Sequence, residues 1–218
     1  EQPLAPFSES MRLGLWITGQ KNVAGWNAKS APQTIFDLKA VVAEILRRLG
    51  VASDSLQSKQ KADDVFAARL DISTRSSKHV GMLGIVRNST LKRFEIEQET
   101  FYAELDWNAL MRLAAKATPL FKPLPKSHPV KRDLALLLDN SVTFAQVEDV
   151  VRRSDRKLLR DVVLFDVYEG HGLPEGKKSY AIAITLQDDE KTLVDKQIDA
   201  VMKKITMNLE KTLGATLR

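Results

Sequence analysis

Val130-Lys-Arg-Asp-Leu-Ala-Leu-Leu-Leu138 is a β-strand pattern, and Thr143-Phe-Ala-Gln-Val-Glu-Asp-Val-Val-Arg-Arg153, close behind it, is a helix pattern. In the first stretch leucine recurs at every second position near the end, as expected for a strand with one buried face. In the second, Thr143 and Gln146 have the spacing with which two side chains satisfy free backbone amides at a helix start. The pair predicts a strand that leads into an amphipathic helix.

The rest of the C-terminal half continues this arrangement. A second helix begins with the capping pattern Thr192-Leu-Val-Asp195 and carries an apolar stripe from Val194 to Leu209. The predicted order is strand 130–138, helix 144–153, strand 159–169, strand 178–187, helix 193–209 and a short strand within 215–218. This βαββαβ order is that of a ferredoxin-like domain.

Strand alternation separates the two faces of the predicted sheet, because helices in this topology cover only one face. We expect a buried face formed by Leu134, Leu136, Leu138, Val163, Phe165, Val167, Tyr180, Ile182, Ile184, Leu186 and Leu217. The helix-free face is then formed by Asp133, Ala135, Leu137, Leu164, Asp166, Tyr168, Ser179, Ala181, Ala183, Thr216 and Arg218.

One end of the helix-free face combines groups suited to an unpaired nucleotide. With the strand order 4-1-3-2 and neighbours about 4.8 Å apart, the residues at that end are Ala135, Asp166, Tyr168, Ser179 and Arg218. The tyrosine offers a stacking platform, the aspartate and serine offer polar groups for a base edge, and the arginine suits phosphate or stacking. An exposed sheet face that is simply partly polar is the alternative.

The N-terminal half reads as a separate, strand-rich module. We expect strands over 11–18, 65–72, 79–86 and 100–105, a loop over 52–64, a helix from Thr34 to Gly50 and a short helix over 107–115. The proline-rich stretch 118–129 interrupts this pattern. The predicted domains are therefore 1–120 and 127–218, joined by a linker over 121–126.

Composition excludes several function classes. The chain has no cysteine, so disulfides and thiolate chemistry are excluded, and its three histidines lie in separate segments without metal-ligand spacing. No apolar run is long enough to cross a bilayer, and we expect a cytoplasmic protein.

Residues 1–124 hold 17 basic and 13 acidic residues, against 16 and 15 in residues 125–218. Any nucleic-acid contact by the C-terminal half would therefore need a shaped site as well as diffuse positive charge.

Four segments stand out in the C-terminal half: Ser127-His-Pro-Val-Lys-Arg-Asp-Leu-Ala135, Leu164-Phe-Asp-Val-Tyr168, Leu173-Pro-Glu-Gly-Lys-Lys-Ser179 and Leu213-Gly-Ala-Thr-Leu-Arg218. Together they resemble the anticodon-binding domain of bacterial phenylalanyl-tRNA synthetase β subunits. Three upstream segments are similar to the region preceding that domain: Thr34-Ile-Phe-Asp-Leu-Lys39, His79-Val-Gly-Met-Leu-Gly-Ile-Val86 and Phe101-Tyr-Ala-Glu-Leu-Asp106.

The resemblance implies an α+β protein in which a partial class II synthetase-like antiparallel sheet module, without catalytic residues, precedes the ferredoxin-like domain. It implies anticodon recognition through Ala135, Asp166, Tyr168, Ser179 and Arg218. It further implies a tRNA for phenylalanine and a catalytic α subunit as partners, in a heterotetramer of two α and two β subunits. ATP and Mg²⁺ are implied for the parent synthetase, with no cofactor or metal bound by this segment. Because Glu1 is not an initiator methionine, we expect a fragment of a longer subunit.

Two other functions stay open at this point. Ferredoxin-like domains also bind metabolites and support dimers, so a small-molecule regulatory module is the second hypothesis. A free-standing hydrolase is the third, although the loop 139–143 lacks a glycine-rich anion cradle.

Overall fold

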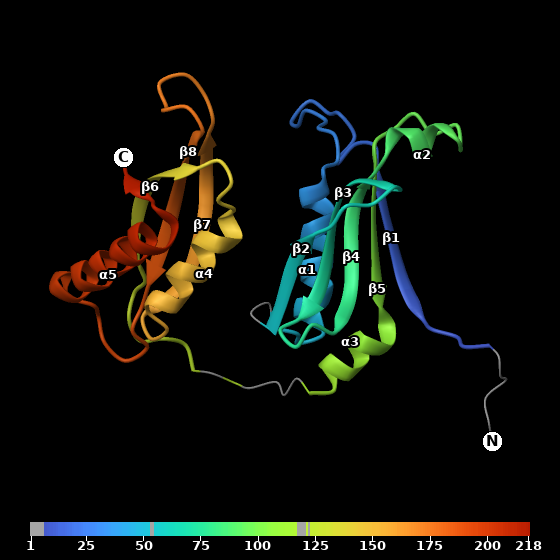
Figure 1. Cartoon of the computed structure of the whole chain (residues 1–218). Helices are drawn as coiled ribbons and strands as arrows, with labels where there is room; N and C mark the ends of the chain where they lie inside the picture. Colours follow the sequence, from blue (N-terminus) through green and yellow to red (C-terminus); the bar gives the residue numbers. More distant parts are fainter. Residues whose placement is uncertain (1–6, 53–54, 117–120, 122) are drawn as a thin grey trace. The chain divides into compact units, whose positions relative to one another are not determined.

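The computed structural model of the chain describes residues 7–52, 55–116, 121 and 123–218 (Figure 1). Its internal contacts divide it into two compact units, Glu1–Leu120 and Phe121–Arg218. Each unit has a hydrophobic core built from its own residues. Residues 117–120 and 122, within or beside the predicted linker, lie outside the described residues. The predicted α+β class with antiparallel sheets is confirmed.

The first unit is a five-stranded antiparallel sheet with the order β1-β5-β4-β3-β2. Helices α1 and α3 supply Leu38 and Leu110 to the same core as Phe101 and Leu105 of β5, so both helices cover one face of the sheet. In chain order the elements are β1 (Arg12–Thr18), α1 (Ile35–Arg48), β2 (Leu56–Gln60), β3 (Phe66–Thr74), β4 (His79–Val86), α2 (Asn88–Lys92), β5 (Thr100–Asp106) and α3 (Trp107–Ala114).

Strand β2 lies inside the segment that the sequence predicted as a loop, and that prediction is wrong. Its residues are mostly exposed, and it pairs with β3 from Leu56↔Thr74 to Gln60↔Leu70. An edge strand pairs through its backbone on one side and needs few apolar side chains. The polar sequence of β2 therefore lacks the apolar alternation by which a strand is predicted.

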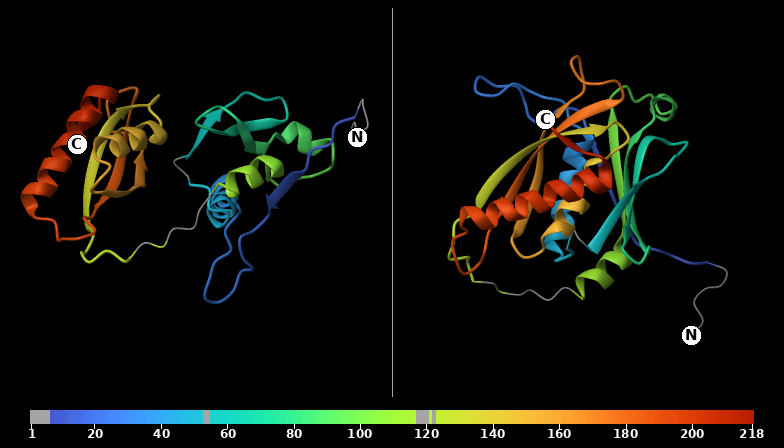
Figure 2. Two further views of the ribbon diagram at one scale, coloured as in Figure 1. Left: turned by 90° about the horizontal axis from the view of Figure 1, so that it is seen from below. Right: turned by 60° about the vertical axis from the view of Figure 1, so that its left-hand side comes forward.

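The second unit is a four-stranded antiparallel sheet with the order β7-β8-β6-β9, which confirms the predicted strand order. Figure 2 shows α5 lying alongside this sheet. In chain order the elements are β6 (Val130–Asp139), α4 (Phe144–Ser154), β7 (Leu159–Tyr168), β8 (Lys177–Leu186), α5 (Asp195–Leu213) and β9 (Thr216–Leu217).

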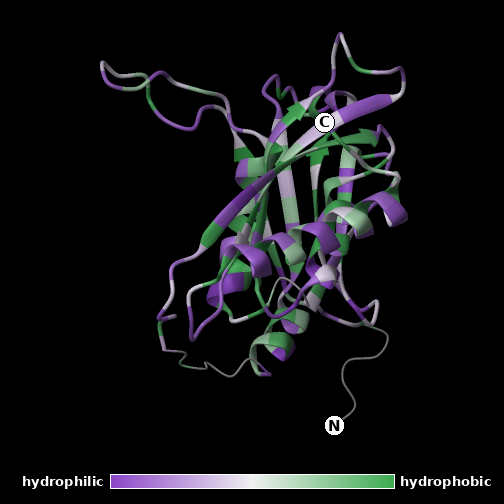
Figure 3. Ribbon diagram, turned by 90° about the vertical axis from the view of Figure 1, so that its left-hand side faces the viewer, coloured by the Kyte–Doolittle hydropathy of each residue, from purple (hydrophilic) through white to green (hydrophobic). Residues whose placement is uncertain are grey.

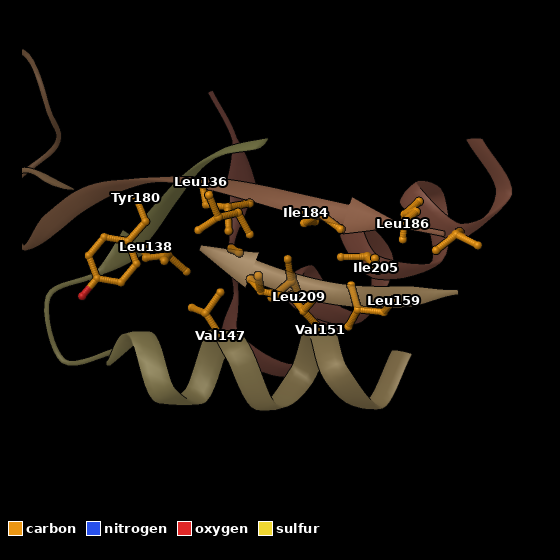
Figure 4. Close-up of a cluster of buried hydrophobic side chains, with 14 of the residues drawn as sticks. Leu136, Leu138, Val147, Val151, Leu159, Tyr180, Ile184, Leu186, Ile205 and Leu209 are labelled. Carbon is orange, nitrogen blue, oxygen red and sulfur yellow. The ribbon is translucent and has the colours of Figure 1, made fainter. Parts of the chain in front are cut away.

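Helix α4 begins where its sequence predicts. The Thr143 backbone N–H donates to Gln146 Oε1 at 2.8 Å. Val147 and Val151 then point from α4 toward the strands and pack in one core with Leu136, Ile184, Ile205 and Leu209 (Figure 4). The apolar sides of both helices thus cover one face of the sheet and leave the other free of helices.

Helix α5 begins later than its capping pattern predicted. Its N-cap is Val194, whose backbone N–H donates to Gln197 Oε1 at 3.3 Å, whereas Thr192 precedes the helix. Leu193 is buried in the core, and Val194 has an extended backbone with φ −95° and ψ 152°. Gly214, in the left-handed region with φ +62°, ends the helix.

Strand β7 departs from simple alternation. Val162 and Leu164 pair with Ile184 and Ile182 and face the core, whereas Val163 is 47% and Phe165 56% exposed. The register shifts once between Leu159 and Asp161 and again between Leu164 and Asp166, which leaves one extra residue at each bulge. Predicted burial of Val163 and Phe165, and predicted exposure of Leu164, are therefore wrong. Predicted burial of Val167 and Leu217 is also wrong, since these side chains are 49% and 53% exposed.

Figure 3 shows hydrophobic and hydrophilic residues mixed along the helices. Among the described residues, none of the helices is both long enough and apolar enough to cross a membrane.

Candidate nucleic-acid interface

The floor of the candidate site consists of small side chains on the helix-free face of the second unit. Ala181 of β8 lies between Ala135 of β6 and Asp166 of β7, since it is the register partner of both. Ser179, two residues before Ala181 and on the same face of β8, pairs with Tyr168 of β7. The downstream bulge in β7 lies before Asp166, so Asp166 and Tyr168 keep the face that alternation assigned to them.

These residues enclose one shallow pocket of about 440 Å³, lined by Ala135, Asp166, Tyr168, Ser179, Ala181 and Arg218. All five residues singled out in the sequence are brought together here. The sixth, Ala181, was placed on the correct face but was not singled out as a contact. Its position between Ala135 and Asp166 in the strand register is the signal that identifies it.

Tyr168 and Arg218 form the walls of the pocket. They come from β7 and from the residue after β9, at opposite edges of the sheet, and the Arg218 Cζ atom lies 5.6 Å from the centre of the Tyr168 ring. This distance suits a cation–π contact. The two long side chains meet above the sheet because the residues between them are small.

Both walls are also tied to backbone groups. The Tyr168 hydroxyl donates to the His171 carbonyl oxygen at 2.8 Å. The Arg218 backbone N–H donates to the Ala135 carbonyl oxygen at 3.0 Å, which extends the pairing of β9 with β6 by one residue. The hairpin therefore holds the Tyr168 side chain, and the sheet holds the backbone from which the Arg218 side chain extends.

The pocket holds one exposed carboxylate, one buried hydroxyl and one exposed guanidinium, from Asp166, Ser179 and Arg218. A carboxylate accepts hydrogen bonds from amino groups on a base edge, and a guanidinium pairs with phosphate or stacks on a base. With Tyr168, a residue that is 40% exposed, beside them, the arrangement has the chemistry to hold a splayed-out nucleotide.

The first unit contains a different kind of hollow. A cavity of about 560 Å³ lies between α1 and strands β2–β4, and its lining includes Val42, Leu46, Ile72 and Leu83 from the core of that unit. Apart from Ser58, the polar side chains in its lining are Lys39 and Arg47, and Arg47 is paired with Glu44. Within the described part of the chain, no group of three or more histidine or acidic side chains is arranged to hold a metal ion.

Two family models match the chain. Residues 125–218 match the ferredoxin-fold anticodon binding domain, and residues 4–107 match the phenylalanyl tRNA synthetase beta chain CLM domain. The first match includes every residue that lines the 440 Å³ pocket.

Relatives named phenylalanine–tRNA ligase beta subunit align with the chain along nearly all of its length. The protein from Porphyromonas gingivalis is 49% identical over all 218 residues, and that from Bacteroides fragilis is 43% identical over the same span. The protein from Syntrophotalea carbinolica is 34% identical over 96% of the chain. The chain spans about a quarter of the length of these relatives, 27% of the first two and 26% of the third.

The two domain matches follow each other in one chain, and the relatives that align with both share one name. The chain belongs to the phenylalanyl-tRNA synthetase β-subunit family.

Proposed function

We propose that the second unit recognises the anticodon of a tRNA for phenylalanine, using the pocket on the helix-free face of its sheet. Tyr168 supplies a ring on which an unpaired base stacks, and Ala135 and Ala181 keep the floor low enough for the base to enter. Asp166 and Ser179 accept or donate hydrogen bonds at the base edge, and Arg218 contacts phosphate or the second base face. The observation that carries this proposal is the convergence of these side chains on one pocket.

The proposal assigns the first unit a supporting role. Residues 1–120 act as a noncatalytic, class II synthetase-like module that contacts the catalytic α subunit, residues 121–126 serve as a linker, and residues 127–218 bind RNA. The assembly is a heterotetramer of two α and two β subunits that charges tRNA with phenylalanine in the cytoplasm. ATP and Mg²⁺ bind outside this segment. The match of residues 4–107 to a synthetase β-chain domain supports this division.

Replacement of Tyr168 tests the stacking role. In the β subunit assembled with its α subunit, Tyr168→Ala should weaken tRNA binding by about 1–3 kcal/mol, because a base–aromatic stack is lost. Tyr168→Phe is the matched control: it removes the hydroxyl that donates to His171 but keeps the ring, so most of the affinity should remain. Equilibrium binding of labelled tRNA provides the measurement.

A tRNA with a substituted anticodon should bind the native and Tyr168→Ala assemblies with nearly equal affinity. Equal affinity of both assemblies for the unmodified tRNA would contradict anticodon recognition by this face. Free phenylalanine tests the metabolite-binding alternative. Saturable binding of phenylalanine at the pocket, without any effect on tRNA binding, would favour that alternative.

A further inference from the structure

The hairpin after β7 leaves a specific space for the Tyr168 ring. A Cβ atom built on Gly170 would lie 3.0 Å from both Cζ and Oη of Tyr168, and 3.4 Å from its Cε2. Carbon atoms in favourable contact are about 3.5–4.0 Å apart, so any side chain at position 170 meets the ring at its hydroxyl end.

The backbone itself does not require glycine at position 170. Gly172 and Gly176 in the same hairpin have φ values of +93° and +75°, in the left-handed region that favours glycine, whereas Gly170 is not among the positive-φ glycines. Apart from its chain neighbours, no atom of the described residues lies within 4 Å of a Cβ built on Gly172. Glycine thus serves two different purposes in one loop: backbone conformation at position 172, and space for a ring at position 170.

The hydroxyl of Tyr168 is held next to this space. It donates to the His171 carbonyl oxygen at 2.8 Å, one residue beyond the glycine. Because the hydroxyl is already hydrogen-bonded within the chain, the part of Tyr168 left for a ligand is its ring. The hairpin determines the position of that ring above the floor of the pocket. A shift of the ring at its outer end would also stretch this hydrogen bond.

We propose that Gly170 is a positioning residue: by lacking a side chain, it fixes the placement of the Tyr168 ring at the candidate site. The placement of the ring follows from the geometry of the free chain. Its consequence for RNA rests on the function proposed above. Gly170 touches no ligand itself and acts through Tyr168.

The ring placement is tested on the free 218-residue chain, without RNA. The chain has three tyrosines, so selective ¹³C labelling of their rings gives three resolvable sets of NMR signals. In Gly170→Ala the Tyr168 signals should shift while those of Tyr102 and Tyr180 stay in place, and Gly170→Val should shift them further. Gly172→Ala is the matched control, since it strains the backbone without placing an atom near the ring; it should lower the unfolding temperature and leave the Tyr168 signals nearly unchanged.

The effect on RNA is tested by a double-mutant cycle in the assembled synthetase. Gly170→Ala should weaken tRNA binding about threefold to tenfold when Tyr168 is present and should have no further effect in a Tyr168→Ala background. A loss of equal size in both backgrounds would show that Gly170 acts by another route and would overturn the proposal. Unshifted Tyr168 signals in both Gly170 variants would also overturn it.

The two tests separate the two ideas. If Gly170→Ala shifts the Tyr168 signals while neither Gly170→Ala nor Tyr168→Ala changes tRNA affinity, the positioning role stands and anticodon recognition by this face fails.

Discussion

At the scale of single residues, the site depends on side chains that are small as much as on those that are large. Tyr168 and Arg218 meet across the sheet because Ala135 and Ala181 do not fill the space between them. Ala135 faces away from the two helices, so its size is not constrained by the core. A larger side chain there would occupy the volume in which we expect a base.

Ala135→Leu should therefore weaken tRNA binding by about tenfold or more while leaving the fold intact. The matched control is Ala183→Leu, on the same face of β8 but outside the pocket lining, which should bind tRNA nearly as the native protein does. Binding of labelled tRNA and thermal unfolding of both variants provide the measurements. Equal losses of affinity in the two variants would indicate a general effect on the sheet face rather than a filled pocket.

At the scale of elements, helix α1 is fixed at its start by a charged cap. Asp37 Oδ2 accepts the Thr34 backbone N–H at 2.7 Å, and Asp37 Oδ1 lies 2.8 Å from Lys21 Nζ. The hydrogen bond from Lys21, followed by those from Thr34, lowers the pKa of Asp37 from 3.8 to about 2. Because its folded-state pKa lies below the unfolded value, ionised Asp37 stabilises the fold above about pH 4, and this contribution is lost as the pH falls toward 2.

Asp37→Asn should lower the unfolding temperature at pH 7, and the difference from the native chain should shrink between pH 4 and pH 2. Glu44, whose pKa is also lowered to about 2 by Arg47 and Arg48, is present in both proteins, so the difference isolates Asp37. Thermal unfolding followed by circular dichroism at several pH values provides the measurement. A difference that persists undiminished at pH 2 would contradict the role of the Asp37 charge.

Regular elements of this chain could be predicted from sequence because their patterns are local. The start of α4 at Thr143, the strand order of the second unit and the convergence of the five site residues all follow from capping chemistry and from alternation. The bulges in β7 could not be predicted, because an extra residue in one strand is defined only by its register with β8. Each bulge reverses the alternation upstream of it, which explains why Leu164 was misplaced while Asp166 was not. Gly170 was missed because its role depends on where the Tyr168 ring lies.

At the scale of the whole molecule, the two units have separate hydrophobic cores. The core of the second unit is built from β6, α4, β7, β8 and α5, together with the segment around Leu193 and Ala215. Among the residues that the structure describes, none from the first unit belongs to this core. A domain of roughly 100 residues with its own core is large enough to fold alone.

Residues 121–218, produced without the first unit, should accordingly fold into a stable domain. We expect a well-dispersed amide NMR spectrum and a single cooperative thermal transition, because the second core stays complete. A collapsed species without fixed side-chain signals would show that this core depends on the first unit.

The bulges in β7 have a further consequence for how copies of the molecule behave in solution. β7 is an outer strand of its sheet, and Val163, Phe165 and Val167 on it are each about half exposed. A straight strand with these side chains would offer a row of free backbone groups for another chain to extend into a larger sheet. The bulged positions Arg160 and Phe165 break that row and twist the strand. The two bulges make the faces of β7 unpredictable from sequence. The same bulges therefore protect the domain against edge-to-edge aggregation.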